Sequence, residues 1–142
     1  MIHTVLGSCV SVVLFDPVNR YGSMCHAVLD ADPYQQDITY CSKYVDCVID
    51  EMFSNFAEHG TVIKNLVTKI FGGAQMLVRG KASSQAIQPG VKNILMAKNK
   101  IQEYGCLIEA EDCGGFQGRK IYFCSHTGEV FLKRIKKTYG IS

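Results

Sequence analysis

The chain opens with two apolar, β-branched segments that are separated by a bend. Residues 2–5 and 10–15 are rich in Val, Leu and Phe, which is typical of strands, and Gly-Ser-Cys at 7–9 interrupts them. Residues 16–22 contain Pro, Asn and Gly, so they predict a turn. The apolar pattern resumes at 24–29. The sequence therefore predicts that this last strand folds back beside the one before the turn.

Two longer segments repeat their apolar residues every three or four positions, which is typical of helices with one buried face. Residues 39–59 show this spacing from Tyr44 to Phe56, and Gly60 follows as a stop signal. Residues 91–104 show it again and are followed by Gly105. We expect two helices in these places.

Short alternating segments fill much of the remaining chain and predict four more strands. They lie at 65–71, 107–112, 119–125 and 129–135, the last two joined by a turn at 126–128. The strands come as hairpins, and the helices stand between groups of strands. The expected fold class is therefore α+β, with mixed sheets covered by helices.

Length and composition bound the kind of protein. The 142 residues, 47% of them hydrophobic, suit a single domain over 1–142 with a core of its own. Apolar runs fall far short of the ~20 residues of a membrane span, and no signal peptide follows Met1, so we expect a cytoplasmic protein without membrane insertion. The net charge of +2 gives no dense basic face except Lys-Arg-Ile-Lys-Lys at 133–137, which disfavours nucleic acid as a partner.

The seven cysteines are odd in number and unevenly spaced, so a fully paired disulfide framework would leave one over. Reduced thiols are the expectation. The spacing contains no CxxC or CxxH knuckle, and we therefore expect no metal site.

Cys9 and His26 are the candidate reactive residues. Cys9 follows Gly7 and Ser8 at a sharp bend, where small residues admit a substrate carbonyl and backbone amides can face an oxyanion. The predicted hairpin returns His26, seventeen residues later, toward the bend, where a neutral imidazole can accept the thiol proton. The residues alone leave an alternative open, in which Cys9 is an ordinary core thiol and His26 a histidine without catalytic function.

Ordered motifs along the chain resemble one known family. They are Thr-Val-Leu-Gly-Ser-Cys-Val at 4–10, Asp-Pro at 16–17, a His in the context Gly-x-x-x-His-x-x-Leu at 22–29, Lys-Ile-Phe-Gly-Gly-Ala at 69–74, Gly-Val-Lys-Asn-Ile at 90–94 and Asp-Cys-Gly-Gly-Phe-Gln-Gly-Arg at 112–119. In this order they resemble the chemoreceptor glutamine deamidases of the CheD family, over nearly the whole chain.

The resemblance implies a Cys-His-Thr hydrolase that converts glutamine side chains of bacterial chemoreceptors to glutamate through a thioester. Cys9 would be the nucleophile, His26 the base and acid, and Thr4 the residue that orients His26. It also implies a CheD-like cysteine hydrolase fold of layered sheets and helices, ordered α/β/β/α, and no cofactor. The implied partners are the cytoplasmic helices of the receptor and a CheC-type phosphatase.

Two departures from the family pattern concern the N-terminal part. Some members carry the Thr one residue further from the Cys, where this chain has His3, and members usually have a strand before the motif that this chain lacks. These departures support a second hypothesis, a binding module for receptors or a CheC-type phosphatase with weak or lost catalysis. A papain-like peptidase would share the nucleophile but needs an extended groove, for which the sequence contains no sign.

Gly72 and Gly73 also have two interpretations. They follow a predicted buried strand, so a turn with positive φ explains them most simply. Alternatively, they let a receptor helix approach the backbone near Cys9. His26 depends on the hairpin register in a similar way, because a slip of one residue would turn its imidazole to the other face of the sheet.

Overall fold

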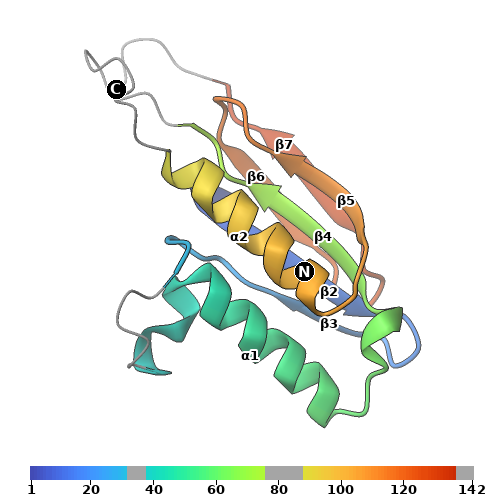
Figure 1. Ribbon diagram of the computed structural model, residues 1–142. Coiled ribbons are helices and arrows are strands. Elements are labelled where there is room, and N and C mark those ends of the chain that lie inside the picture. The colour runs from blue at the N-terminus through green and yellow to red at the C-terminus, as the bar shows by residue number, and fades with distance from the viewer. Residues whose placement is uncertain (32–37, 76–87, 137–142) are drawn as a thin grey trace.

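The computed structural model describes residues 1–31, 38–75 and 88–136, and it has the expected α+β fold (Figure 1). Its elements in chain order are β1 (Ile2–Leu6), β2 (Val10–Asp16), β3 (Tyr21–Met24), the 3₁₀ helix η1 (Ile38–Lys43), α1 (Val45–Glu58), the 3₁₀ helix η2 (Ile63–Asn65), β4 (Val67–Gly72), α2 (Pro89–Glu103), β5 (Ile108–Cys113), β6 (Arg119–Phe123) and β7 (Val130–Arg134).

The strands form two sheets. The four-stranded sheet has the order β3-β2-β4-β5, in which β2 pairs antiparallel with both neighbours and β4 pairs parallel with β5. The three-stranded sheet has the order β1-β6-β7 and is antiparallel throughout. The predicted hairpins 10–29 and 119–135 supply β2-β3 and β6-β7, so consecutive strands are paired in both sheets.

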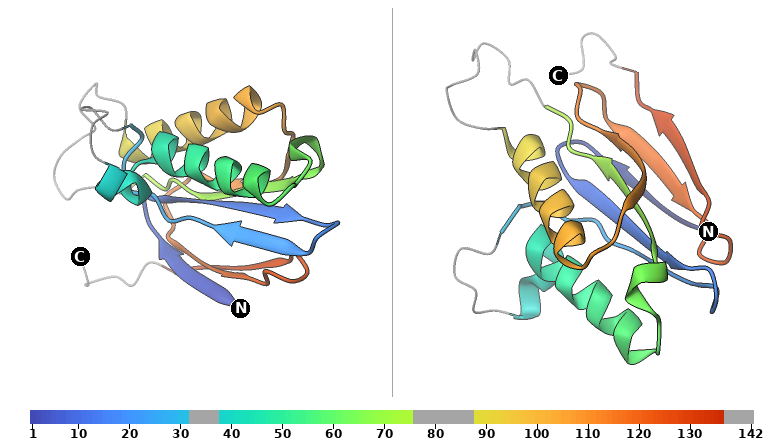
Figure 2. Two further views of the ribbon diagram at one scale, coloured as in Figure 1. Left: turned by 90° about the horizontal axis from the view of Figure 1, so that it is seen from below. Right: turned by 45° about the vertical axis from the view of Figure 1, so that its right-hand side comes forward.

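Two apolar clusters separate three layers. One fills the space between the helices and the four-stranded sheet, and the other lies between the sheets, with Leu6, Ile121 and Phe123 facing Val13 and Phe71. The left view of Figure 2 shows α1 and α2 together on one side of the four-stranded sheet, with the other sheet opposite. The second helical layer that the resemblance implies is absent from the described residues.

Every residue of β2 is buried, because α1 and α2 cover one face of this strand and the second sheet covers the other. This explains why its sequence is a continuous apolar run rather than an alternation. The bend at 7–9 leads directly into this central strand, so the candidate nucleophile is attached to the most enclosed element of the fold.

The structure shortens two of the predicted elements for one reason. The helix expected over 39–59 begins only at Val45, because Tyr44 is extended and bridges Leu29. The strand expected over 24–29 ends as β3 at Met24, and beyond it only isolated bridges continue, including the pair Val10 and Ala27. Pairing between segments distant in sequence has replaced the local preference of each.

The expectation that all seven cysteines are reduced thiols is wrong, because Cys41 and Cys47 form a disulfide that links η1 to α1. Cys9 is among the free cysteines. The described part of the chain contains no cluster of three His, Cys, Asp or Glu side chains suited to a metal. None of the helices among the described residues has the length and apolar character needed to cross a membrane.

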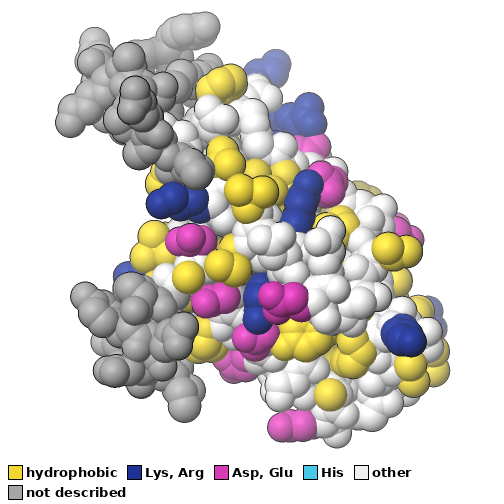
Figure 3. Space-filling model, viewed as in Figure 1, with side chains coloured by type: hydrophobic (Ala, Val, Ile, Leu, Met, Phe, Trp, Pro, Cys, Tyr) yellow, Lys and Arg dark blue, Asp and Glu magenta, His cyan; other side chains and the backbone are white. Residues whose placement is uncertain are grey.

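Charges of both signs stand next to each other over the two helices (Figure 3). Lys100 of α2 binds Asp50 of α1 at 2.7 Å, and Lys98 binds Glu111 of β5 at 3.0 Å. On this face the described residues form pairs of opposite charge. They do not form a continuous basic patch, which is the kind of surface that attracts a polyanion.

Asp16 closes the β2–β3 turn and is buried. Its carboxylate accepts a 2.6 Å hydrogen bond from the Thr61 hydroxyl and further bonds from the amides of Val18 and Asn19. These bonds favour the ionised form, and the bond from Thr61 contributes most to lowering the pKa of Asp16. The turn is thereby tied to the segment that follows α1.

We expect Thr61→Val to lower the free energy of unfolding by about 1–2 kcal/mol at neutral pH, because a buried carboxylate loses a donor. A lowered pKa adds stability above the ordinary pKa of an aspartate, and that stability is lost as the pH falls through the lowered value. Urea unfolding at pH 7 and pH 3 should therefore show a smaller difference between the two proteins at pH 3.

Thr68→Val is the matched control, since the buried Thr68 hydroxyl donates to the neutral Leu107 carbonyl at 2.6 Å. Its effect should be similar at both pH values. An effect of Thr61→Val that is equally independent of pH would contradict the assigned role of Asp16.

Candidate active site

The bend that carries Cys9 is held by hydrogen bonds to its backbone carbonyl groups. All three consecutive carbonyls accept hydrogen bonds from residues that are distant in sequence and lie around the end of β4 and the start of α2. The donors are the amide of Ala74 to Gly7 at 3.0 Å, the side-chain nitrogen of Asn93 to Ser8 at 3.0 Å, and the amide of Gly73 to Cys9 at 2.9 Å. The segment 7–9 that carries the candidate nucleophile is therefore held in place although it belongs to no strand.

Gly72 and Gly73 form the turn against which this bend packs. Both have positive φ, at 104° and 71°, which favours glycine. A Cβ atom on Gly72 would overlap the carbonyl oxygen of Cys9, and one on Gly73 would overlap Ile94 of α2. The interpretation of the pair as a turn is thus supported, and close backbone contact with Cys9 explains why it needs glycine. An approach of substrate at this point stays a prediction.

His26 lies on the segment that pairs with the start of β2. Val10 and Ala27 exchange two backbone hydrogen bonds, of 3.0 and 2.9 Å, so Cys9 and His26 occupy diagonal positions across this pair. Diagonal neighbours in an antiparallel pair are about 7–8 Å apart, within reach of long side chains. Val10 and Ala27 face the helices, whereas Cys9 packs against the cluster between the sheets. Alternation therefore directs His26 to the same face as Cys9.

Thr4 reaches His26 from the other sheet. Its Oγ1 lies 2.6 Å from Nδ1 of His26, a hydrogen bond between residues 22 positions apart. Thr4 is on β1 two residues before the buried Leu6, so both side chains point toward the four-stranded sheet. The stacking of the two sheets thus brings together Thr4 and His26, two of the residues expected from the sequence. In this chain the Thr lies one residue closer to the Cys than in some family members, and this offset does not prevent the contact.

Burial changes the pKa of both reactive groups in directions that keep them neutral. Desolvation raises the pKa of the half-buried Cys9 thiol, which its own backbone amide partly opposes. Desolvation also lowers the pKa of His26, although the residue is exposed overall. At neutral pH the site therefore holds a thiol and an uncharged imidazole, the protonation states that proton transfer from sulfur to nitrogen requires.

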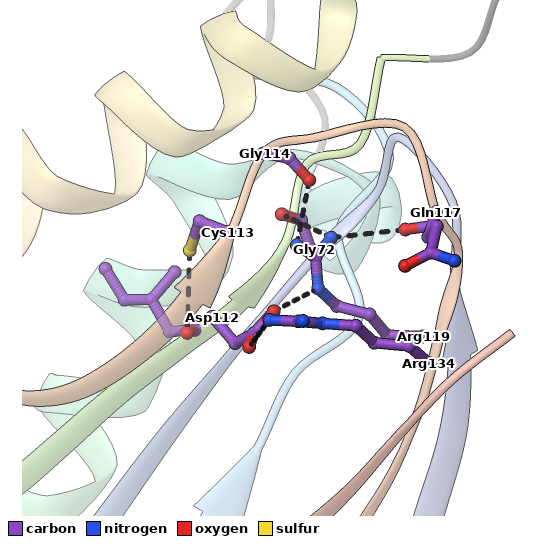
Figure 4. Close-up of polar contacts among 8 residues, drawn as sticks. Gly72, Asp112, Cys113, Gly114, Gln117, Arg119 and Arg134 are labelled. Carbon is purple, nitrogen blue, oxygen red and sulfur yellow. Dashed lines mark hydrogen bonds and ion pairs between the residues drawn. The ribbon is translucent and has the colours of Figure 1, made fainter.

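Arg119 and Asp112 form an ion pair next to the Gly72 turn (Figure 4). Arg119 is only 4% exposed and binds Asp112 through Nε at 2.6 Å. Its terminal nitrogens donate to the carbonyls of Gly114, at 2.8 Å, and Gly72, at 3.4 Å. Arg119 therefore does not belong to a solvated strand edge, because its guanidinium is buried against Asp112 and two glycine carbonyls.

A pocket of about 280 Å³ opens beside His26, between the segment 23–26 and the helices η1 and α1. Ser42, Glu51 and Asn55 give it polar walls on the helical side. Because Cys9 is half-buried and His26 is exposed, the candidate site is reached from the surface rather than through a deep channel.

Residues 30–134 match the protein family described as CheD chemotactic sensory transduction. The chain belongs to the CheD family. A protein of Geobacter sulfurreducens named probable chemoreceptor glutamine deamidase CheD 2 is 40% identical over 140 residues, which cover 97% of this chain and 82% of that protein.

Two further CheD relatives come from a bacterium and an archaeon. Each is named probable chemoreceptor glutamine deamidase CheD and is 34% identical to this chain. The one from Maridesulfovibrio salexigens matches over 143 residues, 96% of this chain and 84% of that protein. The one from Thermococcus kodakarensis matches over 130 residues, 92% of this chain and 80% of that protein.

Sequence reasoning missed Asn93, Arg119 and Asp112 as residues around the candidate site, although two of them carry a readable signal. Asn93 is in helical register with the buried Ala97 and Ile101, so it is a polar residue on an apolar stripe. Arg119 alternates with the buried Ile121 and thus faces inward on its strand. A polar residue in a buried register requires a specific partner, and here the partners are carbonyls near Cys9.

We expect Gly72→Ala to destabilise the protein and to slow alkylation of Cys9, because the new methyl group displaces the Cys9 carbonyl. Gly114→Ala is the matched control, since Gly114 also has positive φ but nothing lies near its Cβ position. The control should cost about 1–2 kcal/mol for the left-handed backbone, and Gly72→Ala about 1–3 kcal/mol more for the overlap.

Thermal unfolding and the alkylation rate of Cys9 measure both effects. Equal losses of stability in the two variants, with equal Cys9 reactivity, would show that Gly72 is not required by contact with Cys9.

Proposed function

We infer that this protein is a protein-glutamine deamidase that converts glutamine side chains of chemoreceptors to glutamate. One observation carries the inference, namely the Thr4–His26 hydrogen bond beside the Cys9 bend in a chain whose relatives are named probable chemoreceptor glutamine deamidases. Cys9 is the proposed nucleophile, His26 the proposed base and acid, and Thr4 the residue that orients the imidazole.

In the first half of the proposed reaction, His26 takes the proton from the Cys9 thiol while the sulfur attacks the side-chain carbonyl carbon of glutamine. A C–S bond forms and the carbonyl oxygen becomes an oxyanion. His26 then returns the proton to the amide nitrogen, the C–N bond breaks, and ammonia leaves a thioester. A Thr4 hydroxyl that accepts from Nδ1–H leaves Nε2 free for these transfers.

In the second half, His26 removes a proton from water as the water oxygen attacks the thioester carbon. A C–O bond forms, the C–S bond breaks, and the proton passes to the Cys9 sulfur, which restores the thiol and releases glutamate. The chemistry requires no cofactor, since one thiol and one imidazole supply every proton transfer.

The oxyanion is proposed to lie against the backbone amides of the bend at 7–9. The carbonyls of Gly7, Ser8 and Cys9 all accept bonds from the protein. By contrast, the Ser8 amide has no acceptor within the described ranges 1–31, 38–75 and 88–136. Preorganised amide donors of this kind stabilise developing negative charge.

Fold, cellular location and partners are part of the proposed function. The fold is taken to be a CheD-like cysteine hydrolase fold in a single domain over 1–142. The protein is proposed to act in the cytoplasm on the cytoplasmic helices of a receptor, with a CheC-type phosphatase as a second partner. A site reached from the surface suits a glutamine displayed on a folded helical bundle.

Incubation of a chemoreceptor cytoplasmic fragment with the protein should convert specific glutamines to glutamate, each adding about 1 Da, as peptide mapping by mass spectrometry will show. Cys9→Ala should abolish conversion, because it removes the nucleophile. His26→Ala should slow conversion by about 10²–10⁴-fold, the typical contribution of a general base, and leave a residual activity. Cys124→Ala is the matched control, since Cys124 is another partly exposed free thiol.

Conversion by the Cys9→Ala variant would contradict the proposed mechanism. A wild-type protein that binds the fragment but converts no glutamine would instead favour a docking module without catalysis. Cleavage of the main chain would indicate a peptidase.

The pH dependence of kcat/KM should show an acid limb centred below about 6.5, the ordinary pKa of histidine. Protonation of His26 removes the base, and burial lowers its pKa, so the loss of activity moves to lower pH. Thr4→Val should reduce kcat by about tenfold or more, less than loss of the base itself. Thr4→Ser keeps the hydroxyl and should restore the rate. An acid limb that persists in His26→Ala would assign the titration to another group.

A further inference from the structure

Asn93 connects the two segments that carry the candidate nucleophile and base. It lies in the first half of α2 with 1% of its surface exposed. Its Nδ2 donates to the carbonyl of Ser8 and to the carbonyl of Val28, both at 3.0 Å. Ser8 directly precedes Cys9, and Val28 follows His26 by two residues. One side-chain amide of α2 therefore joins both segments.

The backbone pairing between these segments ends where Asn93 acts. Val10 and Ala27 exchange hydrogen bonds, and a continued antiparallel ladder would next pair Ser8 with Leu29. The Leu29 amide instead donates to the carbonyl of Lys43 at 3.1 Å. The Ser8 carbonyl thereby loses its ladder partner, and the Asn93 side chain takes the place of that donor.

The start of α2 is seated firmly against the same structure. A Cβ atom on Gly90 would overlap the carbonyls of Gly73 and Ala74, so the helix touches the turn that holds Cys9. Asn93 stands one turn further along this helix. The Asn93 side chain therefore starts from a helix that is fixed in place, and it sets the positions of both acceptor carbonyls relative to that helix.

The amide chemistry of Asn93 suits a residue that joins two carbonyl groups. Both neighbours are carbonyl oxygens, so the nitrogen of the amide must face them. The other end, Oδ1, is buried and has no partner within the described residues. An unpaired buried oxygen lowers stability. An asparagine at this position is therefore explained by the two hydrogen bonds that its nitrogen donates to the carbonyls of Ser8 and Val28. A shape-matched apolar residue would avoid it but could not hold the carbonyls.

We propose that Asn93 is a positioning residue that sets the spacing of Cys9 and His26 by binding the carbonyls of Ser8 and Val28. The inference rests on the proposed function for the roles of Cys9 and His26. Asn93 touches neither side chain of the pair. It acts through the backbone. On the Cys9 side of the Val10–Ala27 pair, its side chain links the segment 7–9 to the segment 26–28, and its loss lets the two segments separate there.

The test measures the reactivity of Cys9 toward iodoacetamide as a function of pH, without any receptor. Trypsin releases residues 1–20 as one peptide that contains Cys9 as its single cysteine, so mass spectrometry follows this thiol alone. The proteins compared are wild type, His26→Ala, Asn93→Leu and the double variant. Leu keeps the branching of Asn and removes both donors.

Near neutral pH we expect His26→Ala to slow alkylation of Cys9 about tenfold or more, since burial raises the pKa of the unassisted thiol. Asn93→Leu should slow it by a comparable factor. The double variant should be no slower than His26→Ala alone, because Asn93 acts only through the Cys9–His26 pair. With receptor fragment, Asn93→Leu should lower kcat and leave KM nearly unchanged.

Thr68→Val is the matched control for lost stability, because it removes another buried side chain–carbonyl hydrogen bond at the opposite end of β4. It should lower the melting temperature without changing the pH profile of Cys9. Asn93→Ala provides a second variant should Asn93→Leu unfold at the assay temperature.

The outcomes separate the two proposals. If His26→Ala slows alkylation but the folded Asn93 variants match wild type, the positioning role is overturned and the proposed function stands. If His26→Ala has no effect, both are overturned, because Cys9 and His26 do not act as a pair. Additive losses in the double variant would assign Asn93 to general stability instead.

Discussion

Close packing of the bend at 7–9 against the turn at 72–74 is the constraint on which the site depends. The amides of Gly73 and Ala74 hold two of its carbonyls, and the backbone approach is too close for any side chain on Gly72. Cys9 therefore has a defined position although it lies between strands. An exposed loop would not maintain a thiol at one place, so the glycine turn supplies the rigidity that the proposed catalysis by Cys9 requires.

The second requirement is that two sheets stack face to face. Thr4 belongs to the three-stranded sheet and His26 follows β3 of the four-stranded sheet, yet they share a 2.6 Å hydrogen bond. The apolar cluster around Leu6 and Phe123 holds the sheets together. The same burial keeps the Cys9 thiol and the His26 imidazole uncharged, so packing sets both the geometry and the protonation states of the site.

Charged and polar groups beneath the surface complete the support. Burial of Arg119 with Asp112 carries a desolvation cost, and an apolar pair would avoid it. The guanidinium, however, also donates to the carbonyl of Gly114 at 2.8 Å and, at 3.4 Å, to that of Gly72, which accepts the Gly114 amide as well. Asn93 does the same for Ser8. The irregular backbone around the candidate nucleophile leaves carbonyls outside the strand ladders, and the side chains of Asn93 and Arg119 donate hydrogen bonds to them.

The sequence by itself determined the strands and the helical stripes and singled out Cys9 and His26 as candidates, because periodicity and a short motif are local signals. It placed the start of α1 too early, since the bridge from Tyr44 to Leu29 is not local. Only the tertiary structure decided that Asn93, 85 positions from Ser8, would hold its carbonyl, and that the carbonyls of Gly72 and Gly114 would lie beside Arg119. Contacts of this kind depend on which chain segments become neighbours after folding, and no local pattern encodes that choice.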